Sequence, residues 1–155
     1  MSIPHVLFPL FLVTFLLAAP VGADSHVYRG PYASGTPAWT LRDQHLYAGP
    51  YASGTPIWTW KNGHLYRGPY ASGAPEWTWH DGHFYRGPYA SGTPEWTWKD
   101  GRLYRGPYAS GAPVYAWNDS HLWKGPYTSG TPILSWDNLD EIPTPILVFL
   151  TFLAG

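Results

Sequence analysis

Apolar and polar residues alternate in short stretches that recur along most of the chain, and the stretch from Trp96 to Arg105, WTWKDGRLYR, shows the pattern. Its central pair, Asp100-Gly101, is typical of a two-residue β-turn, because glycine accepts the positive φ of a type I′ turn. The stretch therefore predicts a β-hairpin. Counting outward from the turn sets the facing pairs: Lys99 with Arg102, Trp98 with Leu103, Thr97 with Tyr104, and Trp96 with Arg105.

One face of this predicted hairpin is rich in tryptophan, because side chains alternate between the two faces of a strand. The first face carries Trp96, Trp98, Leu103 and Arg105, and the second carries Thr97, Lys99, Arg102 and Tyr104. An isolated two-stranded hairpin is only marginally stable in water. Since a unit this short cannot bury its own tryptophans, we expect neighbouring hairpins to cover them.

The hairpin pattern is repeated six times between residues 28 and 141. Proline has no N–H for a β-ladder, so the Gly-Pro of each unit is expected to end a strand and begin the connection to the next hairpin. A fixed period of this kind indicates a repeat architecture. Gly-Pro-Tyr recurs every 19 residues, starting at Gly30, Gly49, Gly68, Gly87, Gly106 and Gly125. Three central units keep the favoured turn glycine, at Gly63, Gly82 and Gly101.

Stacking these hairpins in a row predicts an all-β fold, an elongated solenoid of six 19-residue β-hairpin repeats that occupies residues 24–141. At two strand spacings, about 9.6 Å per unit, six units would make a rod roughly 58 Å long. The outer units have atypical turn pairs such as Asp43-Gln44 and Asn138-Leu139, which we interpret as capping of the two ends. The last unit, with Leu134-Ser135-Trp136, is expected to be the least regular.

Two apolar segments flank the repeats. Residues 1–23 resemble a secretory signal peptide, with Val21 and Ala23 before the cleavage point, and a retained membrane anchor is the alternative. Residues 142–155 form an uncharged hydrophobic C-terminal tail. This tail is similar to a GPI-attachment signal, with attachment near Ser129-Gly130-Thr131 or at Asn138, and the alternative is a strand that caps the last hairpin. The segments predict a secreted protein, soluble or attached to the cell surface.

Composition narrows the function classes. The formal net charge is −1, without the basic surface that a nucleic-acid-binding protein needs. The chain has no cysteine, so disulfides do not stabilise it, although small secreted domains often depend on them. Ten Trp and 12 Tyr, together with 17 Gly and 17 Pro, indicate a fold stabilised by aromatic burial and shaped by turns.

The repeat resembles a known family. Written as W-T-W-x-D-G-x-L-Y-x-G-x-Y-x-x-G-x-P, it is similar to a shortened MORN-type repeat of the bacterial variant, over residues 28–141. The matching letters include Trp96, Gly101, Leu103, Gly106, Tyr108 and Gly111. Common MORN repeats are longer and have a second glycine pair where this chain has Thr-Pro or Ala-Pro. Choline-binding repeats of bacterial surface proteins are a second relative to consider. The MORN resemblance implies a row of hairpins that acts as a scaffold or membrane-associated linker.

The sequence contains no motif typical of catalysis or of a cofactor site. Serine and histidine recur at fixed positions of the repeat, whereas a catalytic triad requires unique residues that converge at one point. One position is occupied by His45, His64, His83 and His121. Stacked units would hold these histidines about 9.6 Å apart, too far to share a zinc ion, and only His80 with His83 could form a close pair. We therefore expect no enzymatic activity, no cofactor and no metal site.

The aromatic residues suggest binding instead. Most tryptophans are expected to pack in the core, with arginines over some of their rings. Rows of tyrosines beside arginines would suit the stacking of sugar rings, and the candidate ligand-stacking residues are Tyr66, Tyr85, Tyr104, Arg67, Arg86 and Arg105. Asn118, in the only N-glycosylation sequon, Asn-Asp-Ser, is a candidate glycosylation site on a predicted turn.

These features predict a secreted or cell-surface, non-enzymatic repeat protein that acts as a structural scaffold or adhesive element. It would associate with itself through open sheet edges, or with other components of the extracellular matrix or surface. The alternative is a multivalent carbohydrate- or cell-wall-binding module that uses exposed rows of tyrosine. Binding to a lipid surface is disfavoured by the small number of basic residues, so contact with a membrane is expected only through a C-terminal anchor.

Overall fold

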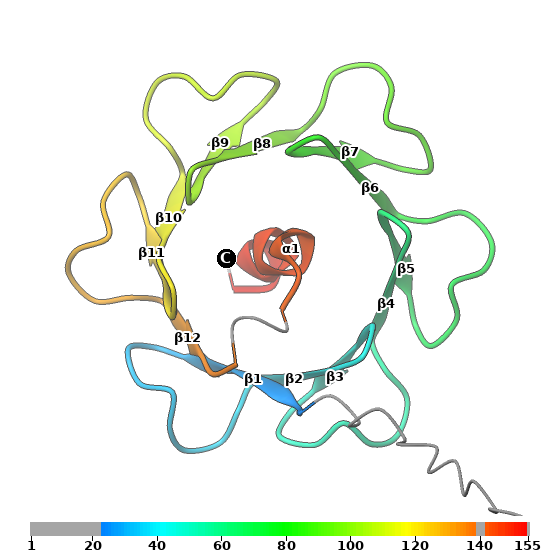
Figure 1. Cartoon of the computed structure of the whole chain (residues 1–155), viewed down its shortest axis with the longest axis vertical. Coiled ribbons are helices and arrows are strands. Elements are labelled where there is room, and N and C mark those ends of the chain that lie inside the picture. Colours follow the sequence, from blue (N-terminus) through cyan, green and yellow to red (C-terminus); the bar gives the residue numbers. More distant parts are fainter. Residues whose placement is uncertain (1–22, 139–141, 155) are drawn as a thin grey trace, which may run out of the picture.

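The computed structural model of the chain describes residues 23–138 and 142–154. They form short antiparallel strands followed by one helix (Figure 1). The elements are β1 (Ser25–Arg29), β2 (Trp39–Arg42), β3 (His45–Ala48), β4 (Trp58–Lys61), β5 (His64–Arg67), β6 (Trp77–His80), β7 (His83–Arg86), β8 (Trp96–Lys99), β9 (Arg102–Arg105), β10 (Tyr115–Trp117), β11 (His121–Lys124), β12 (Leu134–Trp136) and α1 (Thr144–Ala154).

The strands close into a barrel. Each strand pairs with its neighbours in the chain, and β1 also pairs with β12, which joins the two ends of the sheet. Viewed down its axis, the barrel is a ring of hairpins around a central helix (Figure 1). The prediction of all-β hairpin repeats is confirmed, but the predicted elongated solenoid is wrong. An open rod would leave the tryptophan faces exposed along its length, whereas the ring turns them all toward one enclosed core.

The local structure of each hairpin follows the sequence pattern. β8 and β9 pair in the predicted register, with Trp96 opposite Arg105 and Trp98 opposite Leu103. Asp100 and Gly101 have φ angles of 50° and 70°, as a type I′ turn requires. Gly101 also lies close to the next hairpin, because a Cβ added to it would meet the Trp117 carbonyl oxygen at 2.8 Å. The turn glycines thus shape the turn and allow adjacent hairpins to approach.

Substituting Gly101 with alanine should separate these two roles. Gly101→Ala and Gly106→Ala both place a side chain at positive φ, which costs about 1–2 kcal/mol, but a Cβ on Gly106 meets nothing within 4 Å. We expect Gly101→Ala to lower the free energy of unfolding by about 1 kcal/mol more than Gly106→Ala, because a few tenths of an ångström of displacement strains a packed structure. Urea unfolding of both variants measures this difference, and equal losses would show that the contact with Trp117 has no energetic importance.

The hairpin that closes the ring is built from both ends of the repeat array. β1 carries Val27-Tyr28-Arg29 where a complete unit has Leu103-Tyr104-Arg105, and β12 corresponds to the other strand of the unit. The two strands pair in the register of the other hairpins, with Val27 opposite Trp136 and Arg29 opposite Leu134. The two ends of the array therefore supply complementary strands of one hairpin, which corrects the interpretation of the outer units as caps.

Polar contacts fasten this closing seam, in the place of a covalent turn. The Asp137 carboxylate accepts a hydrogen bond from the His26 backbone N–H (2.6 Å), and the Asn138 side chain donates to the Asp24 carbonyl oxygen (3.1 Å). On the other side of β1, away from the seam, the guanidinium of Arg42 at the end of β2 donates twice to the Asp24 carboxylate, at 2.6 and 2.8 Å. These hydrogen bonds lower the pKa of Asp24 below its ordinary value of 3.8. The ion pair therefore stabilises the fold above that pH and loses its effect as the pH falls through the lowered pKa.

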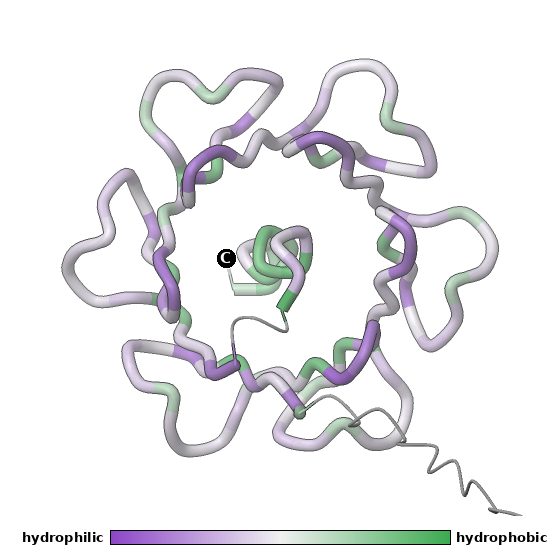
Figure 2. Tube along the Cα trace, viewed as in Figure 1, coloured by the Kyte–Doolittle hydropathy of each residue, from purple (hydrophilic) through white to green (hydrophobic). Residues whose placement is uncertain are grey.

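The apolar C-terminal tail fills the barrel. Wall side chains alone fill the interior of a barrel of about eight strands, so the lumen of this wider ring needs additional atoms. Helix α1, TPILVFLTFLA, supplies them and has a continuous run of buried residues from Pro145 to Thr151. The Phe149 ring meets the Trp58 ring at 4.7 Å between centroids, and the Phe152 ring meets those of Trp77 and Trp96 at 5.3 and 5.2 Å. Figure 2 shows this hydrophobic helix inside the ring.

Residues 144–154 are therefore a core helix, where the sequence had left a capping strand as one alternative. Within residues 23–138 and 142–154, no helix is long and apolar enough to cross a membrane. The predicted signal peptide lies almost entirely outside the described residues. The predicted attachment of a GPI anchor stays a prediction.

The wall of the barrel confirms that tryptophans belong to the core. Trp39, Trp58, Trp77 and Trp136 are buried, and most other tryptophans pack against the same cluster. One position of the repeat is nearly inaccessible to solvent in every unit, with relative exposures of 0–1% at Val27, Leu46, Leu65, Phe84, Leu103 and Leu122. The core thus extends around the whole ring, and α1 is at its centre.

Candidate functional site

Six similar loops project outward from the ring (Figure 1). We call them the GPY loops, residues 30–37, 49–56, 68–75, 87–94, 106–113 and 125–132. Each loop starts at a glycine with positive φ and has a second one at its sixth residue, for example Gly68 (83°) and Gly73 (76°). Hydrogen bonds from Gly68 N to Ile57 O and from Glu76 N to Leu65 O, at 2.8 and 2.9 Å, hold the two ends of that loop.

Buried threonines on the outer face of the sheet fix the start of each of four loops. The Thr59 hydroxyl donates to the Gly68 carbonyl oxygen at 2.7 Å, and Thr40, Thr78 and Thr97 make the equivalent hydrogen bond at the same distance. The His64 Nδ1 lies 3.0 Å from the Thr78 hydroxyl. Since this hydroxyl donates to a carbonyl, Nδ1–H is the donor to its oxygen. The loops consequently stand on a well-ordered support.

The tip of each GPY loop presents an accessible tyrosine. Six tyrosines have relative exposures of 73–74% and are the exposed large hydrophobic residues among those the structure describes: Tyr32, Tyr51, Tyr70, Tyr89, Tyr108 and Tyr127. The loops contain Gly, Pro, Tyr, Ala, Ser and Thr, without a charged residue. The ring therefore displays the same uncharged aromatic surface six times around its circumference.

The tyrosines predicted from the sequence occupy another position. Tyr66, Tyr85 and Tyr104 are half-buried on the outer face of the strands. The Tyr66 and Tyr85 rings each contact a histidine ring, His64 and His83, at 6.2 Å between centroids. They support the wall and have less free surface than the loop tyrosines.

The predicted arginines point to the tryptophan side of the strands. The guanidinium carbons of Arg67, Arg86 and Arg105 lie 4.9, 4.3 and 5.8 Å from the ring centroids of Trp58, Trp77 and Trp96. Glu76 and Glu95 also accept hydrogen bonds from Arg67 Nε and Arg86 Nε, at 2.6 and 2.8 Å. Because neighbouring residues of a strand face opposite ways, these arginines do not join the tyrosines in one site.

The sequence did contain a signal for the loop tyrosines. Gly-Pro-Tyr marks the period and the end of a strand, and the proline before each tyrosine excludes a central strand, where the ring could have been buried. Residues on loops fixed by a rigid scaffold often contact ligands. This combination would have pointed to Tyr32 and its equivalents.

Histidines lie on the outer face or in the turns. His80 and His83 are opposite each other across one turn, as expected. His121 has Nδ1 at 2.7 Å from the Ser120 hydroxyl and Nε2 at 3.0 Å from the Pro31 carbonyl oxygen, which links β11 to the first GPY loop. Among the described residues, no group of three or more His, Cys, Asp or Glu side chains is arranged to bind a metal ion.

The chain has no significant match among protein-family models, curated proteins or solved structures. The resemblance to MORN-type repeats therefore stays a prediction, and the function is inferred from the geometry of the chain itself. Asn118, the candidate glycosylation site, is exposed between β10 and β11, where the sequon can be reached from solvent.

Proposed function

We propose that this protein is a non-enzymatic, multivalent adhesion protein that binds carbohydrate through its six GPY loops. The observation that supports the proposal is the set of six tyrosines with 73–74% exposure at equivalent loop positions around a closed ring. Secretion or surface display belongs to the same proposal and rests on the signal-like segment at residues 1–23.

The chemistry of the loops suits an uncharged, hydroxylated partner. Tyrosine provides a large, rigid and amphipathic contact area, and serine and glycine provide adaptable hydrogen bonding, a combination that other binding loops use. The GPY loops themselves contain no charged residue, and each places a serine two residues after its tyrosine, for example Ser91 after Tyr89. The C–H face of a sugar can stack on the phenol ring while its hydroxyls bond to Ser, Thr and backbone groups.

The repetition of the site points to a repetitive partner. One loop offers a small contact, so its affinity for a single sugar is expected to be weak. Six linked contacts can raise the overall affinity by a factor of about 10²–10⁴ when the partner also displays many copies of one unit. Glycans on a cell surface or in a matrix have this property. The closed sheet favours adhesion over strand-edge assembly, because β1 and β12 pair with each other and leave no free edge among the described strands.

A glycan array tests this proposal with the full-length chain. We expect the wild type to be retained on a subset of surface glycans, and a variant with the six loop tyrosines changed to alanine to lose retention. Changing three alternate loops, Tyr32, Tyr70 and Tyr108, should weaken retention by about tenfold, because avidity depends on the number of contacts. All these side chains are exposed, so the variants should keep the far-UV spectrum and unfolding midpoint of the wild type.

The matched control is the triple change of Tyr66, Tyr85 and Tyr104 to phenylalanine, which keeps the half-buried rings and removes only their hydroxyls. Retention should be unchanged in this variant. If the six-alanine variant is retained as well as the wild type, the GPY loops are not the binding surface. If the wild type is retained on no glycan, the carbohydrate proposal is wrong.

A further inference from the structure

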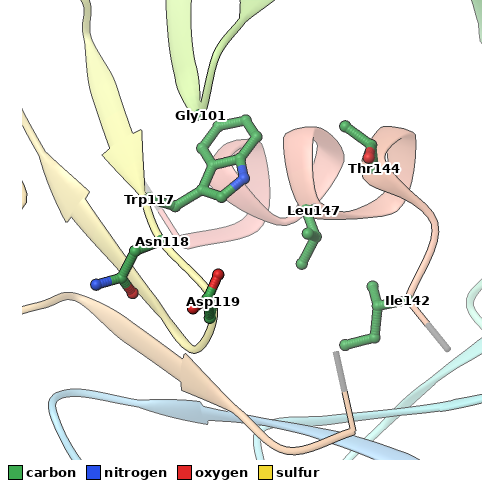
Figure 3. Close-up of a pocket in the computed structure, with 7 residues that line it drawn as sticks. All are labelled: Gly101, Trp117, Asn118, Asp119, Ile142, Thr144 and Leu147. Carbon is green, nitrogen blue, oxygen red and sulfur yellow. The ribbon is translucent and has the colours of Figure 1, made fainter. Parts of the chain in front are cut away.

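One mouth of the barrel contains a cavity of about 310 Å³, whose lining includes no GPY loop residue (Figure 3). Its wall includes the β8–β9 turn at Gly101 and the start of helix α1. We call it the mouth cavity. Its lining side chains are Trp117, Asn118, Asp119, Ile142, Thr144 and Leu147. Binding pockets begin at about 300 Å³, so the mouth cavity has room for a small molecule and not for a polymer.

The mouth cavity lies where the symmetry of the ring is broken. β10 ends at Trp117 and is one residue shorter than β2, β4, β6 and β8. Asn118 occupies the position of Arg42, Lys61, His80 or Lys99 in other units. The turn aspartate also differs, because Asp43, Asp81 and Asp100 have positive φ and Asp119 does not. The repeat thus departs from its pattern at the residues that form the opening.

The lining combines an apolar wall with polar groups. Ile142 and Leu147 are 5% and 6% exposed, and the Trp117 ring lies between Gly101 and Leu147 (Figure 3). The Trp117 ring is held in place by stacking on the Trp98 ring, with ring centroids 6.1 Å apart and an interplanar angle of 24°. Across the opening from Ile142 stands the Asp119 carboxylate (Figure 3). Within residues 23–138 and 142–154, the Asp119 carboxylate, the Trp117 Nε1–H and the Thr144 hydroxyl make no hydrogen bond.

We propose that the mouth cavity is a second binding site, which takes one hydroxylated ligand of monosaccharide size. The ring of such a ligand would stack on Trp117 and Leu147. Two of its hydroxyls would donate to the Asp119 carboxylate, and its oxygens would accept from Trp117 Nε1–H and the Thr144 hydroxyl. This site is a partly open cavity with a carboxylate in its lining, in contrast to the six protruding, uncharged GPY loops.

The mixture of donors and acceptors favours a hydroxylated ligand over a small cation. A carboxylate beside an indole would suit an ammonium group as well, but a cation cannot accept the hydrogen bonds that Trp117 and Thr144 offer. Each sugar hydroxyl both donates and accepts. A ligand of this class would therefore pair with the Asp119 carboxylate, the Trp117 Nε1–H and the Thr144 hydroxyl together, and a ligand that leaves one of these groups unpaired would bind less well.

Proton–nitrogen NMR of the full-length chain, produced in bacteria so that Asn118 carries no glycan, tests the site directly. The indole N–H signal of Trp117 is assigned by its disappearance in Trp117→Phe. We expect this signal to shift on addition of at least one of glucose, galactose, mannose, fucose or N-acetylglucosamine, with Kd in the millimolar range. Asp119→Asn, which keeps the size of the side chain, should weaken the affinity at least tenfold.

Asp100→Asn is the matched control, since it makes the same change in the adjacent turn outside the lining of the cavity, and it should bind like the wild type. No shift with any of the five sugars, or an equal affinity in Asp119→Asn, would overturn the proposal. A shift with choline and none with sugars would overturn it in favour of a cation site. The six-alanine loop variant should keep the Trp117 response, so this result is independent of binding by the GPY loops.

Discussion

Phe149→Ala should lower the free energy of unfolding by about 3–5 kcal/mol, the usual cost of removing a buried phenylalanine ring. Phe149 is 3% exposed at the centre of the lumen and packs against the rings of Trp58 and Phe152, with centroids 4.7 and 5.9 Å away. The barrel wall cannot collapse into the space that its ring leaves, because hydrogen bonds around the closed sheet fix the circumference. The cavity therefore persists, and the loss should fall in the upper part of this range.

Urea unfolding followed by tryptophan fluorescence measures this loss, and the near-UV spectrum reports whether the remaining side chains are still ordered. Tyr108→Ala is the control, since it removes an aromatic ring of similar size that is 73% exposed. Its stability should differ from the wild type by at most about 0.5 kcal/mol. A loss below about 1 kcal/mol in Phe149→Ala would show that the helix does not fill the barrel in solution.

Trp136→Ala should have a comparable effect, about 3–5 kcal/mol, at the seam that closes the ring. Trp136 is 3% exposed, lies opposite Val27 of β1, and donates from Nε1 to the Asp119 carbonyl oxygen at 3.0 Å. The seam differs from other hairpins because no short turn connects its two strands. β1 can therefore separate from β12 without unfolding of the remaining strands.

Hydrogen exchange distinguishes this local opening from a general loss of stability. In Trp136→Ala the amides of β1 and β12 should exchange faster than those of β6 and β7, measured under conditions where the variant is still folded. Trp60→Ala changes a tryptophan in a hairpin with a covalent turn, so β1 should keep its relative protection in that variant. Uniform acceleration over all strands in Trp136→Ala would contradict the idea that the ring opens first at its seam.

The hairpins were predictable because their determinants are local. Asp100-Gly101 sets the turn, the turn sets the register, and alternation assigns Trp98 and Leu103 to one face. None of these steps depends on the rest of the chain. The same local rules hold for a rod and for a ring, so they could not decide between the two.

The closure depended on residues more than 100 positions apart. The signal was present, since the array begins with the second strand of a unit, at Val27, and ends with the first strand, at Trp136. Each half has the hydrogen-bonding groups that the other needs. The position of the C-terminal tail inside the barrel could not be predicted from the sequence, for a different reason. An apolar helix without charge, such as 144–154, has no polar face from which its orientation could be inferred.

The binding surface was only partly predictable. The sequence indicated rows of aromatic residues, but the choice between Tyr85 and Tyr89 depended on which ring the fold leaves exposed. The mouth cavity could not be foreseen at all, because it is formed between the turn near Asp119 and the start of a helix whose place inside the barrel the sequence does not reveal. Such a site exists only once the tail is inside the barrel.

The helix inside the ring restricts how the number of repeats can change. Near-identical tandem units are prone to gain or loss by unequal recombination, and an open array would tolerate either change. Here each unit adds two strands, and the diameter of a barrel grows roughly in proportion to its strand number. A single helix is about 10–12 Å wide with its side chains, so five units would leave too little room for it and seven would leave a void. The copy number of this repeat is therefore set by the width of an α-helix.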